Sequence, residues 1–252
     1  MSERDAAVGS PDDDAVVVVI PTYNERENLP SLVAEILALG DRYRILVVDD
    51  NSPDGTGALA DELTQQYAGR VEVLHRPGKQ GLGRAYVAGL THALEMGPAL
   101  IAQMDADHSH RPVDLAKMVA AAEQADLVLG SRYIPGGNTV GWPRYRKLIS
   151  RAGGIYAGLV LGMHIRDLTG GFKVWRPEAL RAIELSSIHS DGYGFQIETT
   201  FRANQKGYRL VQVPITFTDR IAGKSKLSRR IILEAVTMVW RLRLRQLLKR
   251  DW

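Results

Sequence analysis

Short apolar runs alternate with longer amphipathic stretches through the first half of the chain. The run AVVVVIP (15–21) is rich in β-branched residues and ends in proline, which is typical of a buried strand. The next stretch, ERENLPSLVAEILAL (25–39), carries apolar residues at helical spacing. The same alternation continues along the chain. It predicts further strands at 43–50, 71–77, 99–107 and 125–133.

Strands that alternate with helices predict an α/β fold, with a mostly parallel sheet flanked by helices. In such sheets, ligands bind beyond the carboxyl ends of the strands. Polar residues gather at these predicted strand ends, at 21–25, Asp49, Asp50, Asp105, Asp107 and Arg132. Because they come from several strands, they predict one shared site.

The pattern changes after residue 133. The stretch 134–143 (IPGGNTVGWP) is expected to be a long loop, and 144–163 a helix that is first basic and then apolar. Further loops and helices are expected around 167–180 and 190–208, and a strand at 209–217. We expect three parts: a disordered tail (1–14), a catalytic domain (15–228) and a basic amphipathic C-terminal helix (229–252).

Composition narrows the classes of function. The chain has 252 residues, a formal net charge of +3 and no cysteine, which excludes disulfides, thiolate ligands and a thiol nucleophile. It has no G-x-S-x-G elbow, no P-loop and no dinucleotide fingerprint. No apolar run predicts a membrane-spanning helix. Basic residues dominate from 220 onwards, and the C-terminal helix has the composition of one that lies on a membrane surface. The alternative is a helix that packs on the domain or on another subunit.

The segment AQMDADHSHRP (102–112) places two carboxylates, Asp105 and Asp107, after the fourth predicted strand. Such a pair suits Mg²⁺ or Mn²⁺ completed by water and diphosphate oxygens. A lone D-x-D is more often an Asx-turn, but its position at the shared strand edge favours a site. We interpret His108 and His110 as exposed polar residues, because their spacing alone does not indicate a zinc site.

Seven ordered segments resemble the polyprenol-phosphate (dolichol-phosphate) mannose synthases, which are inverting GT-A glycosyltransferases of family two. They are IPTYNERENLPSLV, VVDDNSPDGT, GLGRAYVAGL, MDADHSH, GSRY, DLTGGFKVWR and DRIAGKSKLS. The resemblance runs from about Val16 to Ser228. It implies a GT-A fold and a glycosyltransferase activity.

The resemblance also implies roles for individual residues. Those implied to bind the donor are Pro21, Tyr23, Glu25, Val48, Asp50, Asp105, Ala106, Asp107, Arg220 and Lys226. Those implied to hold the metal are Asp105, Asp107 and Ser109, and those implied to hold the acceptor phosphate are Arg132, Arg146 and Ser150. The implied catalytic set is Asp107, Arg132, Arg220 and Lys226.

The activity implied is transfer of mannose from GDP-mannose to a polyprenyl phosphate with inversion, assisted by Mg²⁺ or Mn²⁺. The acceptor oxygen is already anionic near neutral pH, so no strong general base is required. The expected location is the cytoplasmic face of a membrane, reached directly or through a membrane-protein partner, and no nucleic-acid partner is expected. The alternatives are a UDP-glucose-dependent glucosyltransferase, a non-catalytic nucleotide-sugar-binding subunit and a nucleotidyltransferase.

Overall fold

Seven strands form the central sheet, in the spatial order β3-β2-β1-β4-β7-β5-β8. The computed structural model describes residues 14–219 and 229–248. The strands of this sheet are β1 (Val16–Thr22), β2 (Tyr43–Asp49), β3 (Val71–His75), β4 (Leu100–Gln103), β5 (Leu127–Ser131), β7 (Lys173–Trp175) and β8 (Leu210–Pro214). Neighbours pair in parallel, except that β7 is antiparallel to β4 and to β5. The predicted α/β fold with a mostly parallel sheet is therefore confirmed.

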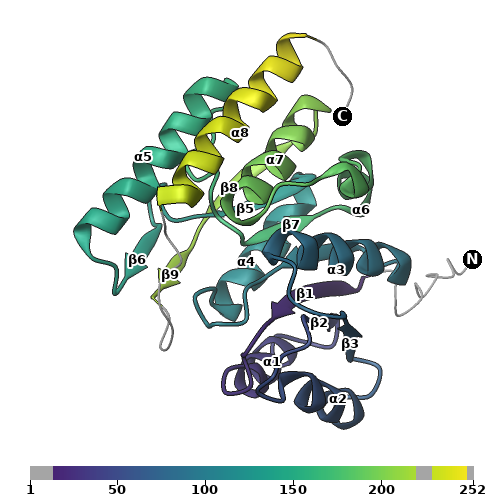
Figure 1. The fold of residues 1–252 in the computed structure, drawn as a ribbon. Helices are drawn as coiled ribbons and strands as arrows, with labels where there is room; N and C mark the ends of the chain where they lie inside the picture. Colours follow the sequence, from purple (N-terminus) through teal and green to yellow (C-terminus); the bar gives the residue numbers. More distant parts are fainter. Residues whose placement is uncertain (1–13, 220–228, 249–252) are drawn as a thin grey trace, which may run out of the picture.

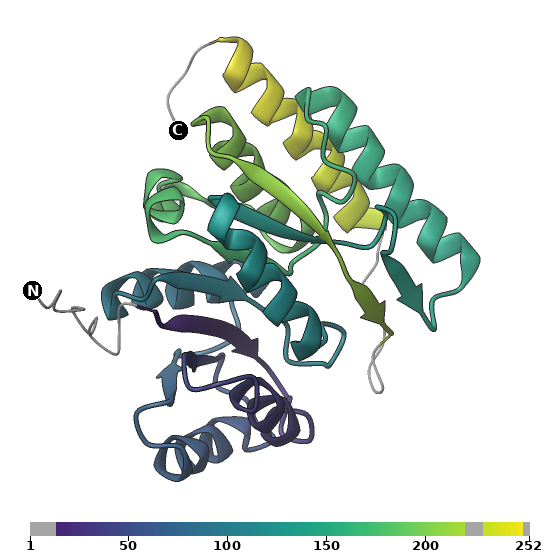
Figure 2. The ribbon, with the colours of Figure 1, turned by 180° about the vertical axis from the view of Figure 1, so that it is seen from behind.

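Helices cover both faces of the sheet (Figures 1 and 2). They are α1 (Leu29–Leu37), α2 (Thr56–Gln66), α3 (Leu82–Met96), α4 (Pro112–Ala121), α5 (Arg144–Leu161), α6 (Pro177–Ala182), α7 (Gly192–Gln205) and α8 (Arg229–Leu247). Val16 and Val18 pack in one core with α1, α2 and α4, whereas Val17 and Val19 pack in a second core with α3, α6 and α7. Because both faces of β1 are covered, its sequence is apolar throughout.

The expected C-terminal helix is present as α8, and it lies beside α5 at one end of the molecule (Figure 1). Val239 and Leu242 of α8 are buried in a third core with residues of α5 and α7. Trp240 and Leu244 on the same helix are 51% and 53% exposed. Packing on the domain and an exposed apolar face therefore coexist in α8. Within residues 14–219 and 229–248, none of the helices has the length and apolar composition that a membrane crossing requires.

Three short strands were missed or merged in the sequence prediction. β7 lies within 167–180, where only loops and helices were expected. The single strand predicted at 209–217 is divided into β8 and β9 (Thr216–Thr218), and β9 pairs with β6 (Asn138–Val140) inside the expected loop. β6, β7 and β9 have three residues each. Their pairing partners are distant in the sequence, and such short segments show no periodicity.

The helix α3 lies close to β1 and β2 because Gly89 has no side chain. A Cβ atom at this position would lie 2.6 Å from Cγ1 of Val19 and 2.6 Å from Cγ2 of Val48. Gly153 in α5 offers a matched control, since a Cβ there would have no atom within 4 Å. The two helical glycines thus differ in available space.

We expect Gly89→Ala to lower the free energy of unfolding by about 1–3 kcal/mol, because α3 must move away from the sheet. Gly153→Ala should raise it by about 0.5–1 kcal/mol, because alanine loses less backbone entropy in a helix. Urea unfolding followed by circular dichroism measures both. Equal effects of the two substitutions would contradict this account of the packing.

Candidate active site

The loops after β1 and β2 are joined by the buried carboxylate of Asp49. Its Oδ1 accepts hydrogen bonds from the hydroxyls of Thr22 (3.1 Å) and Ser52 (2.6 Å), and its Oδ2 accepts one from the Ser52 backbone N–H (3.1 Å). The Ser52 hydroxyl also accepts from the N–H of Asn24 (3.1 Å). These bonds fix the loops after β1 and β2 relative to each other at this edge of the sheet.

Three residues predicted to bind the donor, Pro21, Tyr23 and Glu25, lie at the end of β1 and are partly buried. The ammonium group of Lys79 lies 3.6 Å from the centroid of the Tyr23 ring, in cation–π geometry. Glu25 accepts a hydrogen bond from the Asn28 amide (2.8 Å). The tyrosine and lysine together offer an aromatic face beside a positive charge.

The other two predicted donor residues from this region, Val48 and Asp50, differ in their positions. Asp50 is 5% exposed and forms an ion pair with Arg76, which follows β3. Burial raises the pKa of Asp50, and Arg76 opposes that rise. The Val48 side chain is fully buried in the core beneath α3, so only its backbone can contact a donor, and its predicted donor-binding role stays a prediction. Strand alternation directs the side chain away from the edge.

The two aspartates after β4 are each held by a specific hydrogen bond. Oδ1 of Asp105 accepts a hydrogen bond from the Tyr86 hydroxyl (2.8 Å). Oδ1 of Asp107 accepts one from the Ser109 backbone N–H (3.1 Å), which is the Asx-turn considered from the sequence. Ala106 between them packs in a hydrophobic core, so its side chain does not line the site. The Asx-turn leaves room for ligand binding, because it uses only one of the four carboxylate oxygens of Asp105 and Asp107.

The prediction that both histidines are exposed is wrong for His110, which is 2% exposed. Its ring stacks on Phe172, with centroids 4.6 Å apart, and its Nδ1 accepts a hydrogen bond from the Asp105 N–H (3.1 Å). Burial lowers the pKa of His110, which favours the neutral ring that such an acceptor needs. His108 is half-buried and hydrogen-bonds through Nε2 to the Ser31 hydroxyl (2.9 Å). His110 therefore positions the Asp105 backbone.

The oxygen atoms near the aspartates fit a hard divalent cation that keeps other ligands. The Ser109 hydroxyl is buried and makes no hydrogen bond within the part of the chain that the structure describes. The same described residues contain no group of three or more His, Asp or Glu side chains that could hold a metal ion. Mg²⁺ and Mn²⁺ are commonly bound by one or two carboxylates together with water and phosphate oxygens. Asp105, Asp107 and Ser109 suit that mode.

Arg132, predicted as a phosphate-binding cation, is instead buried against Asp167. Its Nε and Nη2 donate to the two carboxylate oxygens at 2.7 Å each, and its backbone N–H donates to Oδ2 at 3.0 Å. Nη2 also donates to the Thr169 hydroxyl (2.9 Å). Burial acts against the charge, but Asp167 outweighs it and raises the pKa of Arg132. Arg132 and Asp167 thus form a neutralised pair, because a buried guanidinium requires a partner.

Arg146 and Ser150, predicted to bind the acceptor phosphate, lie one turn apart on α5. The guanidinium of Arg146 donates to Oδ1 of Asp219 (2.8 Å) and lies 4.1 Å from the centroid of the Trp142 ring. The two predicted cations Arg220 and Lys226 lie outside the described residues. Arg146 therefore contacts the last described residue before the gap.

Two polar residues of the interior were not singled out from the sequence. Lys173 in β7 is fully buried, and its amine donates to the Gln196 backbone carbonyl (2.8 Å) and to the Thr199 hydroxyl (2.7 Å). Gln196 in α7 is 3% exposed, and its side-chain oxygen is buried without a hydrogen-bond partner among the described residues. A lysine inside the apolar segment FKVW was the signal available in the sequence for the first of them.

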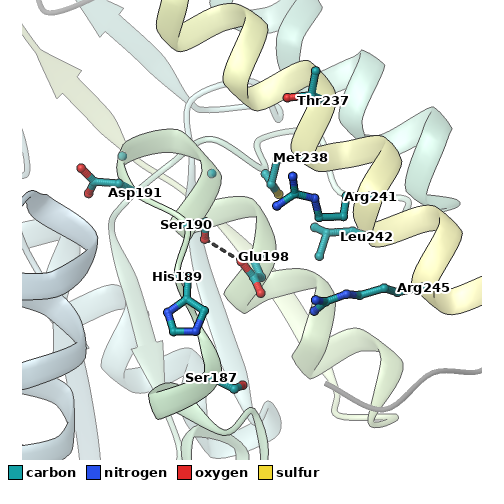
Figure 3. Close-up of a pocket in the computed structure, with 12 residues that line it drawn as sticks. Ser187, His189, Ser190, Asp191, Glu198, Thr237, Met238, Arg241, Leu242 and Arg245 are labelled. Carbon is teal, nitrogen blue, oxygen red and sulfur yellow. Dashed lines mark hydrogen bonds between the residues drawn. The ribbon is translucent and has the colours of Figure 1, made fainter.

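A cavity of about 470 Å³ lies between the segment 187–192 and α8 (Figure 3). Arg241 and Arg245 of α8 face Ser190 and Glu198 across it, and Ser190 donates a hydrogen bond to Glu198 (2.6 Å). The neighbouring Asp191 accepts a hydrogen bond from the N–H of Gly83 in α3 (2.5 Å). This segment therefore lies between α8 and the start of α3.

Comparison with known proteins gives two kinds of match. The family model described as "Glycosyl transferase family 2" matches residues 17–184. A protein named polyprenol monophosphomannose synthase, from Mycolicibacterium smegmatis, is 48% identical over 230 residues, 90% of this chain and 87% of that protein. An undecaprenyl-phosphate mannosyltransferase from Micrococcus luteus is 48% identical over 226 residues, 90% of this chain and 93% of that protein.

Solved structures share the fold at low sequence identity. Glucosyl-3-phosphoglycerate synthase from Mycobacterium tuberculosis, in complex with Mg²⁺ and UDP, has a TM-score of 0.66 and 18% identity, and the match covers 91% of this chain and 79% of that one. The mannosyltransferase PcManGT from Pyrobaculum calidifontis, in complex with GDP-Man and Mn²⁺, has a TM-score of 0.59 and 16% identity, covering 95% of this chain and 66% of that one.

The buried amine of Lys173 predicts a specific pH dependence of stability. Burial lowers the pKa of Lys173 well below its usual range. Between the lowered folded pKa and the unfolded value of about 10.4, the unfolded chain holds the extra proton. The free energy of unfolding should therefore rise with pH in that window, by up to about 1.4 kcal/mol per pH unit from this group.

We expect Lys173→Met to remove this contribution, so that stability rises less steeply with pH in the variant than in the wild type. Urea unfolding at a series of pH values from neutral to mildly alkaline measures both slopes. Parallel curves for the two proteins would show that the amine is charged in the folded state, contrary to this account.

Proposed function

The chain belongs to glycosyl transferase family 2, and we propose that it transfers mannose from GDP-mannose to the phosphate of a polyprenol. The observation that carries this proposal is the extensive sequence identity with two enzymes named for polyprenol-phosphate mannose synthesis. The choice of GDP draws on the structural neighbour in complex with GDP-Man. In this proposal, 15–228 form the catalytic domain and 229–252 a helical extension.

The donor extends along the edge of the sheet, from β2 to β4. Its nucleoside lies near Tyr23, Lys79 and Asp50, where an aromatic face and a carboxylate suit a base and ribose hydroxyls. Its diphosphate lies at Asp105 and Asp107. Mg²⁺ or Mn²⁺ held by these carboxylates and Ser109 neutralises charge on the leaving diphosphate. The Tyr86 and His110 contacts position Asp105 for this task.

The acceptor phosphate oxygen attacks the anomeric carbon directly, and the configuration inverts. Its charge near neutral pH makes a general base unnecessary. His110 is buried and lies close to the aspartates in sequence. Its Nδ1 accepts a hydrogen bond from the Asp105 N–H, and it is not needed as a base. Two anionic groups must nevertheless approach each other closely, so the site requires cations on the acceptor side.

Arg146 and Ser150 bind the acceptor phosphate, and Arg132 contributes to the acceptor side from a fixed position. Asp167 neutralises the charge of Arg132. The role of Arg132 is therefore to orient the loop that carries Thr169 and to supply polar N–H groups. Arg146 is paired with Asp219, which an incoming phosphate can displace as partner. Arg220 and Lys226, next in the chain, add charge toward the donor and acceptor phosphates.

The acceptor is a lipid, and α5 and α8 offer a surface for the membrane that holds it. Exposed large apolar residues gather on these two neighbouring helices: Tyr145, Leu148, Ile149, Ile155, Leu159, Trp240, Leu244, Leu247 and Leu248. Arginines interleave with them on α8, which suits an anionic lipid surface. We place this face on the cytoplasmic side of the membrane, where it acts directly or with a membrane-protein partner.

Purified protein with GDP-mannose, a polyprenyl phosphate and Mn²⁺ should release GDP and form the mannosylated lipid. Asp107→Asn should lower kcat/KM by at least about a hundredfold, because charge on the diphosphate is no longer neutralised. Asp61→Asn on the surface is the matched control and should retain activity. Turnover with UDP-glucose in preference to GDP-mannose would support the glucosyltransferase alternative. Donor binding without any product would support a binding subunit.

The proposed membrane face predicts the behaviour of a double variant. Trp240→Asp with Leu244→Asp should reduce cosedimentation with anionic vesicles about tenfold or more. The reason is that charged side chains replace exposed apolar side chains that the membrane would otherwise bury. Val113→Asp, at an exposed apolar position on α4, should bind vesicles as the wild type does. Activity on a short soluble acceptor should persist in the double variant. Equal loss of activity on soluble and membrane-embedded acceptors would instead indicate a structural role for α8.

A further inference from the structure

The side-chain oxygen of Gln196 is one of several buried polar atoms near the site that have no hydrogen-bond partner among the described residues. It is buried, and no described residue donates a hydrogen bond to it. An unpaired buried acceptor costs about 1–3 kcal/mol. Native structures retain such groups where a ligand, ion or water completes them. The amide therefore requires a partner that is not part of the described chain.

The amide and the first aspartate approach the same point. A Cβ atom on Gly171 would lie 3.2 Å from Nε2 of Gln196 and 3.9 Å from Oδ1 of Asp105. Tyr86, which donates to that same oxygen, stacks on Phe195 with ring centroids 5.8 Å apart. Gln196 thus borders the proposed diphosphate site, and a glycine leaves the space between them open.

The part of α7 that carries the amide is held by buried contacts. The buried amine of Lys173 donates to the Gln196 backbone carbonyl (2.8 Å) and to the Thr199 hydroxyl (2.7 Å). Residues on both sides of Gln196 in α7 are buried, including Phe195 and Ile197. A polar group on a rigid, supported element is suited to recognise a ligand by its geometry.

We propose that Gln196 hydrogen-bonds a hydroxyl group of the hexose that the donor carries. The inference rests on the proposed function and on the strand order. The nucleoside is assigned to β2 and β1, the diphosphate to β4, and the acceptor phosphate to the side of β5 and α5. Since β7 lies between β4 and β5, the hexose that links diphosphate to acceptor lies over the start of β7. Gly171 and Gln196 meet there.

The chemistry of the amide selects a hydroxyl group over a phosphate. The unpaired Oε1 accepts hydrogen bonds, and a diphosphate offers only further acceptors at neutral pH. A sugar hydroxyl both donates to Oε1 and accepts from Nε2. A divalent cation is the competing partner for an amide oxygen. The dependence on Mn²⁺ distinguishes the two.

The test compares Gln196→Met with Asn204→Met. Methionine keeps the length of the glutamine side chain without its hydrogen bonds, and Asn204 is an exposed amide on the same helix. We expect Gln196→Met to lower kcat/KM for GDP-mannose by about 10- to 100-fold, because a hydroxyl loses its partner. The Kd for GDP and the Mn²⁺ concentration for half-maximal activity should stay within about twofold of the wild-type values. Asn204→Met should match the wild type throughout.

A series of monodeoxy GDP-mannose donors completes the test. One deoxy donor should be a poor substrate for the wild type but equal to GDP-mannose for Gln196→Met. Unchanged discrimination in the variant would overturn the proposal, as would a parallel loss of GDP or Mn²⁺ binding, which indicates a structural or cation-binding role. Failure of the proposed function is seen separately, because the wild type would then transfer nothing from GDP-mannose.

Discussion

The insertion of β7 between β4 and β5 is the constraint on which the site depends. The two parallel strands do not pair with each other, and each forms hydrogen bonds with β7 instead. Neighbouring strands lie about 4.8 Å apart, so the ends of β4 and β5 are separated by about 10 Å. The aspartates follow one of these strands and Arg132 follows the other. Backbone hydrogen bonds to β7 therefore fix the distance between the aspartates that follow β4 and Arg132, which follows β5.

Several charged side chains of the proposed site form ion pairs within the protein. Asp50 pairs with Arg76, Arg132 with Asp167 and Arg146 with Asp219. Taking a lone charge out of water costs several kcal/mol, which explains why the most buried of these groups have close partners. A charged ligand that binds to such a surface replaces an existing ion-pair partner, as proposed for the acceptor phosphate and Asp219 at Arg146. Two neutral oxygens near the aspartates, Oε1 of Gln196 and Oγ of Ser109, are buried without a hydrogen-bond partner among the described residues.

The sequence predicted the parts of this molecule that depend on local pattern. The five strands before residue 133 are short apolar runs that alternate with helical patterns, and the D-x-D pair follows one of those strands. Arg76, Asp167 and Gln196 could not be found in this way, because their importance arises from partners distant in the chain. His110 was read as exposed for the same reason, since the aromatic residues that bury it come from 172 and 217.

The separation fixed by β7 has a consequence for how such enzymes diversify. Backbone pairing sets the distance between the ends of β4 and β5, whereas the proposed contact with the hexose comes from α7, through side chains such as Gln196. Substitutions at those few positions can alter which sugar is accepted without disturbing the sheet. A change in the distance between the ends of β4 and β5 would require a different strand order in the sheet. On this account, sugar preference depends on side chains, whereas spacing depends on backbone pairing.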